Sequence, residues 1–255
     1  MLLTIDIGNS HVVIGCMEGR EVKQVFRMVT DTKKTEDEYC VDTREILSFY
    51  GVDFSKFDGA IIASVVPQLV SIFKSAVKKL TGLDAMVVGA GMKTGMNIKL
   101  DNPAQLGSDL AAAGVAAMSD YKLPVIIFDM GTATTVSVIN EKSDFLGGAI
   151  IPGLALSVGA LASGTSLLQS VPIEAPKKCI SSNTIDCMKS GAVFGTAAML
   201  DGMIDRMEEE LGTKATIVAT GGLSKVVLPY CRREIIHDED LLLRGLAILY
   251  EKNKR

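Results

Sequence analysis

Two segments of the chain repeat one pattern that suits the handling of phosphate groups. In each, an apolar strand runs into Asp-x-Gly followed by Asn or Thr, and a second strand rich in β-branched residues leaves the turn. The first copy is centred on Asp6 and Gly8, and the second, 123 positions later (129 minus 6), on Asp129 and Gly131. The glycines let a ligand approach the backbone closely, and turn amides and hydroxyls can donate hydrogen bonds to phosphate oxygens.

The aspartates of these turns indicate a cation. Carboxylates repel bare phosphate, so Asp6 and Asp129 make sense if a cation lies between carboxylate and phosphate. Asp-x-Gly is also ordinary hairpin-turn chemistry, which is the alternative interpretation of either copy alone. Two copies with matched flanks favour two related lobes that hold the phosphate chain of ATP.

Two further segments could complete such a site. Asp109 follows Gly107 and Ser108 at an apolar helix start and could serve as a base. An ordinary helix-start acid, favoured by the helix dipole, explains Asp109 equally well. Thr220-Gly221-Gly222 follows an apolar strand, where the glycines would let the backbone lie flat against an adenine or ribose. The alternative there is a plain turn between a strand and a helix.

Composition excludes several classes of protein. The chain has 255 residues, 48% of them hydrophobic, and a mean hydropathy of +0.31, which suits one large domain or two lobes. A net charge of -4 and a pI of about 5.3 give no electrostatic case for a nucleic-acid partner. The five cysteines are scattered without metal-binding spacing, so we expect reduced thiols in a cytoplasmic protein. The uncharged segment 145–173 is broken by glycine and proline, so we expect no membrane span.

The order of elements predicts an α/β protein, because apolar strands alternate with amphipathic helices. Pro67 and Gly82 delimit one such helix, and a helical region from Asn102 to Met118 would carry Asp109. We predict one lobe over residues 1–117 with the first hairpin, and a second over 118–255 with the second hairpin and the Gly-Gly turn.

A long helix is predicted over residues 188–211, with small residues along one face. Each glycine inside a helix costs about 1 kcal/mol relative to alanine. Close helix contact, within the lobe or across a dimer, would explain why these residues are there. The stripe consists of Gly191, Gly195, Ala198 and Gly202.

In their order along the chain, these motifs resemble those of type III pantothenate kinases, within the acetate and sugar kinase/Hsp70/actin superfamily. The resemblance spans nearly the whole chain, and the ordered set is more specific than any single motif. It implies a two-lobed, actin-like (ribonuclease H-like) α/β fold with duplicated mixed sheets and ATP in an interlobe cleft. The motifs include Asp6-Ile7-Gly8-Asn9-Ser10, Thr30-Asp31, Asp37-Glu38-Tyr39, Ser64-Val65-Val66-Pro67, Gly107-Ser108-Asp109, Asp129-Met130-Gly131-Thr132 and Thr220-Gly221-Gly222.

The resemblance also implies a reaction and a role for individual residues. Such enzymes phosphorylate pantothenate to 4'-phosphopantothenate with ATP and magnesium, the first step of coenzyme A synthesis, and require a monovalent cation, potassium or ammonium. Asp109 would be the base, Asp129 would ligate potassium, and Asp6 would hold magnesium, directly or through water. The family forms homodimers with composite sites, in which Thr184 reaches the substrate of the neighbouring subunit. ATP would be bound by Asp6, Ile7, Gly8, Asn9, Ser10, His11, Val12, Val13, Thr132, Gly221 and Gly222, and pantothenate by Leu100, Gly107, Ser108, Asp109, Leu110 and Thr184.

Two positions depart from the family pattern. Leu110 replaces the usual arginine after the catalytic aspartate, and Leu100 replaces the usual tyrosine. Leucine cannot pair with the pantothenate carboxylate, and a lost charge-assisted hydrogen bond costs about 1.5–3 kcal/mol. Lys99 could compensate. The alternatives are therefore an ATP-binding accessory or regulatory relative with a decayed acceptor site, or a kinase for another small alcohol such as pantetheine.

Overall fold

The computed structural model describes residues 1–254, which divide into two compact units. The first unit comprises residues 1–96, 101–119 and those from 240 onward, and the second comprises 97–100 and 120–239. The predicted boundary at 117/118 lies close to the Ser119/Asp120 division. However, the last helix, which the prediction gave to the second lobe, packs in the first unit.

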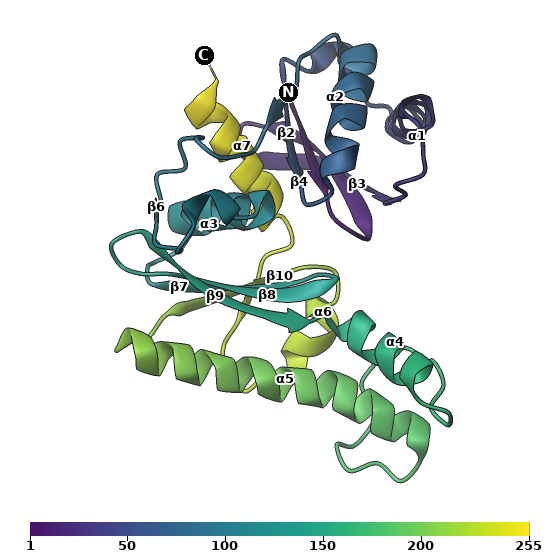
Figure 1. Cartoon of the computed structure of the whole chain (residues 1–255), viewed down its shortest axis with the longest axis vertical. Coiled ribbons are helices and arrows are strands. Elements are labelled where there is room, and N and C mark those ends of the chain that lie inside the picture. Colours follow the sequence, from purple (N-terminus) through teal and green to yellow (C-terminus); the bar gives the residue numbers. More distant parts are fainter. Residues whose placement is uncertain (255) are drawn as a thin grey trace. The chain divides into compact units, whose positions relative to one another are not determined.

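A five-stranded mixed sheet forms the centre of the first unit, in the order β3-β2-β1-β4-β5 (Figure 1). The first three strands are antiparallel neighbours, whereas β4 runs parallel to β1 and β5 parallel to β4. The strands are β1 (Leu2–Ile7), β2 (His11–Glu18), β3 (Glu21–Val29), β4 (Gly59–Ser64) and β5 (Met86–Val87).

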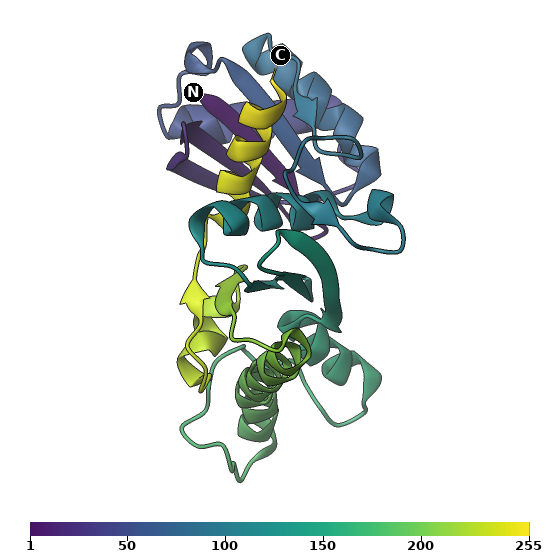
Figure 2. The same ribbon diagram turned by 90° about the vertical axis from the view of Figure 1, so that its left-hand side faces the viewer.

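Helices cover both faces of this sheet. Leu3, Ile5 and Ile7 alternate onto one face and join a buried cluster that includes Phe73 of α2. On the other face α7 lies across β1 and β4 (Figure 2). A methyl group at Gly59 would come within 2.2 Å of the side-chain hydroxyl of Tyr250, which lies in α7, so this contact needs glycine. The helices are α1 (Glu36–Phe49), η1 (Phe54–Lys56), α2 (Pro67–Thr81), η2 (Pro103–Gln105), α3 (Ser108–Asp120) and α7 (Leu241–Asn253).

The second unit repeats this topology. Its six-stranded sheet has the order β11-β10-β7-β8-β9-β6. The run β9-β8-β7-β10-β11 matches β3-β2-β1-β4-β5 in order and in strand direction, with β6 added at the edge. The predicted duplication of mixed sheets is therefore confirmed. The strands are β6 (Asn97–Ile98), β7 (Val125–Met130), β8 (Ala133–Ile139), β9 (Asp144–Pro152), β10 (Thr216–Thr220) and β11 (Ile236–His237).

One face of the second sheet packs against the long helix α5, which runs along the strands in Figure 1. Phe128 of β7 and Leu200 and Ile204 of α5 are fully buried in this core. Within residues 1–254, no helix is long and apolar enough to cross a membrane. The helices of this unit are α4 (Leu154–Gly164), α5 (Thr184–Leu211), α6 (Ser224–Val227) and η3 (Leu228–Tyr230).

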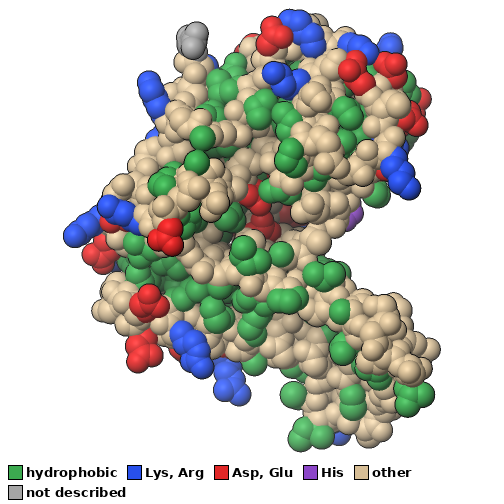
Figure 3. All heavy atoms as spheres, viewed as in Figure 1, with side chains coloured by type: hydrophobic (Ala, Val, Ile, Leu, Met, Phe, Trp, Pro, Cys, Tyr) green, Lys and Arg blue, Asp and Glu red, His purple; other side chains and the backbone are tan. Residues whose placement is uncertain are grey.

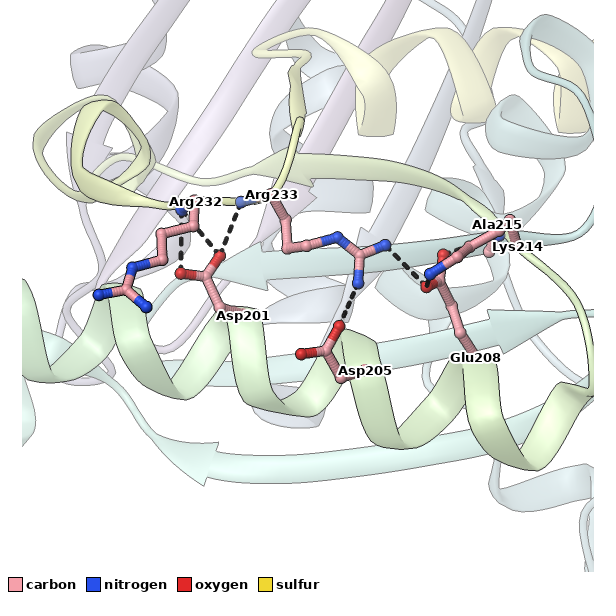
Figure 4. A network of polar contacts seen from close by, with 7 residues as sticks. All are labelled: Asp201, Asp205, Glu208, Lys214, Ala215, Arg232 and Arg233. Atoms are coloured by element: carbon pink, nitrogen blue, oxygen red, sulfur yellow. Dashed lines mark hydrogen bonds and ion pairs between the residues drawn. The ribbon is translucent and has the colours of Figure 1, made fainter.

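An ion-pair network fastens α5 to the segment that leads into β11 (Figure 4). The Glu208 carboxylate, 5% exposed, lies 2.7 Å from the Arg233 guanidinium and accepts a 3.1 Å hydrogen bond from the Ala215 amide. The exposed Lys214 ammonium lies 2.7 Å from the same carboxylate. Burial alone would raise the pKa of Glu208, but these hydrogen bonds outweigh it and hold the pKa at about 2.

We predict that Glu208→Gln destabilises the protein in a pH-dependent way. Because the folded-state pKa lies below the unfolded value of 4.5, the ionised form stabilises the fold fully above that value. The loss should be about 1.5–3 kcal/mol at pH 7, the range for hydrogen bonds to a charged group. This loss of stability should shrink as the pH falls from 4.5, the pKa of Glu208 in the unfolded chain, towards about 2, its pKa in the folded protein.

Urea unfolding at pH 7 and at pH 3.5 checks this expectation. The matched control is Asp205→Asn, because Asp205 pairs with the same arginine but is 66% exposed, so its ion pair is weak. Equal losses for Glu208→Gln at both pH values would contradict the role given to the ionised carboxylate.

Candidate functional site

The first hairpin turn presents exposed polar groups at the end of β1. Ile7 pairs with Val12, which leaves a turn of four residues from Gly8 to His11. The Gly8 amide donates a 3.0 Å hydrogen bond to the His11 carbonyl, and Asn9, Ser10 and His11 are exposed. The turn is therefore ordered, and the side chains predicted to contact ATP are accessible.

Neighbouring strands brace this turn. The Thr30 hydroxyl, just beyond β3, donates a 2.7 Å hydrogen bond to the Gly8 carbonyl. The Thr30 amide donates a 3.0 Å bond to the Ser10 carbonyl, and the Val65 amide, just beyond β4, donates one of 3.0 Å to the Ile7 carbonyl. The sequence pattern gave no role to Thr30, although it belongs to a motif that carried the family resemblance.

The start of α3 is tied to the same end of the sheet. Ser64, the last residue of β4, pairs with Ile7 of β1. The Ser108 hydroxyl accepts a 2.9 Å hydrogen bond from the Ser64 amide and donates one of 3.0 Å to the Ser64 carbonyl. Asp109 follows, half-buried, with one carboxylate oxygen 2.8 Å from the Leu110 amide. The first unit thus brings the predicted base and the first turn to one edge of its sheet.

The second hairpin occupies the equivalent place in the second unit. Its turn is one residue shorter, because Met130 pairs with Thr134 across Gly131, Thr132 and Ala133. Asp129 pairs with Thr135 and Thr220, as Asp6 pairs with Val13 and Ala63 in the first unit. The two aspartates therefore hold matching register positions.

Two glycines bring other segments against this second turn. A methyl group at Gly153, before α4, would come within 2.2 Å of the Thr132 carbonyl oxygen. Gly221 has a φ of +95°, and a methyl group there would come within 2.6 Å of the Met130 backbone. The buried Ser224 hydroxyl donates a 2.6 Å hydrogen bond to the Gly221 carbonyl. The predicted nucleotide turn therefore lies directly on the second hairpin.

The carboxylates suit a cation that is shared with phosphate. Asp6 and Asp129 are both half-buried. Among residues 1–254, no three His, Cys, Asp or Glu side chains gather as a metal cage. Magnesium usually keeps several waters and binds through one or two carboxylates plus substrate phosphates, so these residues fit such an ion.

Leu100 and Leu110, the two positions that depart from the family pattern, are both half-buried. A methyl group at Gly147 of β9 would come within 3.4 Å of the half-buried Leu100 side chain. Hydrogen bonds from Asn140 and Asn97 lower the pKa of Asp144, and the positive charge of Lys99 contributes less. The Lys99 ammonium therefore interacts electrostatically with the Asp144 carboxylate.

An apolar groove of about 570 Å³ lies between α4 and α5. Thr184, the exposed first residue of α5, lines it together with Leu161, Gly191, Gly195 and Met199. Methyl groups on the three stripe glycines would meet nothing within 4 Å. Close contact inside the unit therefore does not explain the stripe. Figure 3 shows hydrophobic and uncharged side chains over α4 and the start of α5, whereas charged ones gather over the other end of α5.

The structure restricts how several of the predicted site residues could contact a ligand. The side chains of Ile7 and Val12 are fully buried in the core, so only their backbone can meet a nucleotide. The hydroxyl of Ser108 is engaged with Ser64, as described above. Gly222 is exposed, with nothing within 4 Å of a methyl group placed there. Gly153 belongs to the motif Gly148–Gly153, which also carried the family resemblance, but the sequence gave it no role at the site. Ser224 was not predicted, because no local pattern marks a residue by the distant backbone that it touches.

Comparison with known proteins agrees with this arrangement. The model of the type III pantothenate kinase family matches residues 2–206. A type III pantothenate kinase of Moorella thermoacetica is 40% identical over 253 residues, which cover 99% of this chain and 100% of that protein. The chain therefore lines up with a protein of this family from end to end.

Solved structures support the fold. A Baf family protein of Campylobacter jejuni superposes with a TM-score of 0.60 at 20% identity, over 98% of both chains. Component A of the (R)-2-hydroxyglutaryl-CoA dehydratase of Acidaminococcus fermentans superposes with a TM-score of 0.58 at 14% identity, over 98% of this chain and 96% of that one. At these identities the likeness concerns the fold alone, and it agrees with the predicted actin-like class. The family model over residues 2–206 and the 40% identity to the Moorella thermoacetica protein show that this chain belongs to the type III pantothenate kinase family.

Proposed function

We propose that this protein transfers the γ-phosphoryl group of ATP to pantothenate, giving 4'-phosphopantothenate in the first step of coenzyme A biosynthesis. Membership of the family, with 40% identity along the whole chain to a protein named for this reaction, carries the proposal. The same relative favours pantothenate over the two alternatives, an accessory protein and a pantetheine kinase. All five cysteines are free, which suits a reducing cytoplasm.

Asp109 is the proposed base. It lies in the first turn of α3, at the sheet edge that also carries the first hairpin turn. The Asp109 carboxylate would take the proton of the pantothenate 4'-hydroxyl while that oxygen attacks the γ-phosphorus in line and ADP leaves. The exposed Asn9, Ser10 and Thr132 would donate hydrogen bonds to the phosphate chain.

The cations complete the charge balance. Asp6 would hold magnesium, directly or through water, and Asp129 a monovalent cation, potassium or ammonium. When bound, these ions neutralise the charge that the phosphate chain carries in the transition state. The matching register of the two half-buried carboxylates supports a cation role for both.

We predict that Asp109→Asn lowers kcat at least 100-fold, because general-base catalysis contributes about 10²- to 10⁴-fold. ATP affinity should stay nearly unchanged, since the hairpins remain intact. Steady-state turnover and calorimetric ATP binding measure the two quantities. Asp120→Asn, at the exposed far end of the same helix, is the control. Near-normal turnover of Asp109→Asn would contradict the assignment of Asp109 as the base.

A monovalent cation at Asp129 should show in the salt dependence of the rate. Replacing sodium by potassium at constant ionic strength should raise turnover of the wild type. Asp129→Ala should abolish this response, because the carboxylate that ligates the ion is gone. Equal wild-type rates in the two salts would argue against the site.

A second copy of the chain is the proposed occupant of the groove between α4 and α5. Gly191 and Gly195 are exposed in the groove and leave room for another helix. Exposed hydrophobic side chains lie on α4, at the start of α5 and in the segment between them: Leu156, Leu161, Leu167, Ile180 and Ile185. Burying such a surface would stabilise a dimer. Thr184, on the rim, would then reach the neighbouring subunit's acceptor site.

We predict that Gly195→Leu weakens both assembly and activity. Leucine is a better helix former than glycine and meets open space in the single chain, so folding should not suffer. Light scattering should give twice 27.1 kDa for the wild type and a smaller mass for the variant. Arg206→Leu adds leucine to an exposed position of the same helix, outside the groove lining, as the control. A fully active wild-type monomer would refute the composite site.

A further inference from the structure

The Ser108 hydroxyl bonds to backbone groups of β4 that have no neighbouring strand, because β5 ends before it reaches Ser64. β5 pairs with β4 only at Ile61 and Ile62, and the Val88 amide then bonds the Ile62 carbonyl at 2.8 Å. Backbone groups two residues apart in a strand point to the same side. The amide and carbonyl of Ser64 therefore point to the side that β5 has left, where the Ser108 hydroxyl meets both.

This bridge uses the only proton that the Ser108 hydroxyl can donate. A serine hydroxyl has one proton to donate. Ser108 donates it to the Ser64 carbonyl and accepts from the Ser64 amide, across 44 positions of chain. In this arrangement its proton is not available to a ligand, and a contact of Ser108 with pantothenate, which the family resemblance implies, would use another atom of the residue.

The residues on either side of Ser108 complete the arrangement. A methyl group at Gly107 would come within 2.4 Å of one carboxylate oxygen of Asp109, so this carboxylate folds back over the glycine. Asp109 also accepts the 2.8 Å hydrogen bond from the Leu110 amide. The anchor at 108 and the space at 107 together restrict where the Asp109 carboxylate can lie.

We propose that Ser108 is a positioning residue, which acts through Asp109 by pinning the start of α3 to the end of β4. The proposal rests on the proposed function, in which Asp109 is the base. Because Ser64 pairs with Ile7, the bridge sets Asp109 relative to the turn that begins at Gly8. A displacement of about 1 Å at a reacting group can cost about 10²-fold in rate.

The first test is Ser108→Ala, measured as kcat and KM for both substrates well below the melting temperature. We expect kcat to fall about 10- to 100-fold, the scale of a small misplacement, with both KM values within about threefold of wild type. Ser108→Thr keeps the hydroxyl and should recover most of the lost rate. Ser119→Ala, an exposed serine of the same helix, is the matched control and should keep the wild-type rate.

Gly107→Ala gives an independent variant that keeps the bridge and crowds only the carboxylate of Asp109. It should show the same loss of kcat without a rise in KM. If Ser108→Ala does not fold, this variant still tests the step on which the proposal depends, that turnover follows the placement of the Asp109 carboxylate. Wild-type kcat in Gly107→Ala would then contradict the arrangement.

A double-mutant cycle separates this proposal from the proposed function. If Ser108 acts through Asp109, Ser108→Ala should cause no further loss in an Asp109→Asn background. Multiplicative losses in the two backgrounds, or a raised KM for pantothenate at unchanged kcat, would overturn the positioning role. A fast Asp109→Asn single variant would instead refute the base assignment, whatever Ser108→Ala does.

Discussion

The parallel pairing of β1 with β4 is the interaction on which the rest of the first unit's site depends. It aligns Ile7 with Ser64, so that the first hairpin turn leaves the sheet level with the point where α3 is anchored. Parallel strands bring their carboxyl ends to one edge, and this edge then gathers groups from three distant segments. Thr30 braces the turn from one side and Val65 from the other. Core packing behind β1 holds the whole edge, because Ile5 and Ile7 are fully buried.

The second unit repeats the same register but secures its turn by different means. In the first unit, hydroxyls of Thr30 and Ser108 bond backbone groups near the turn. In the second, Gly153 and Gly221 let whole backbone segments touch the turn directly. Gly221 also adopts a left-handed conformation that favours glycine. One topology thus carries two turns of different length, four residues against three, with an aspartate at the same register position in each.

Local sequence patterns predicted much of the fold. Where they placed the end of a helix wrongly, a capping residue or a short turn explains the difference. Pro67 and Gly82 mark the ends of α2 as expected, with Gly82 at a φ of +75°. α5 begins at Thr184 rather than near 188, because Asn183 caps it by accepting a 2.9 Å hydrogen bond from the Asp186 amide. The region after Asn102 forms only a short 3₁₀ turn before α3 starts at Ser108.

The long-range failures concern contacts that no spacing encodes. The docking of α7 in the first unit depends on Gly59 and Gly245, which admit Tyr250 and the Ala112 backbone. The Asp-x-Gly turns and Asp109 could be chosen from sequence because their residue types suggest their chemistry. The bridge between Ser108 and Ser64 could not be predicted, since a serine shows no preference for a partner 44 positions away.

The most direct measurement is the identity of the product that the wild-type protein makes from ATP and pantothenate in a magnesium and potassium buffer. Phosphorus NMR with mass spectrometry can follow ATP consumption and locate the transferred phosphoryl group. We expect one phosphoester at the 4'-hydroxyl of pantothenate for each ADP formed. ADP release without a phosphoester, or the same rate of ATP consumption with and without pantothenate, would contradict it.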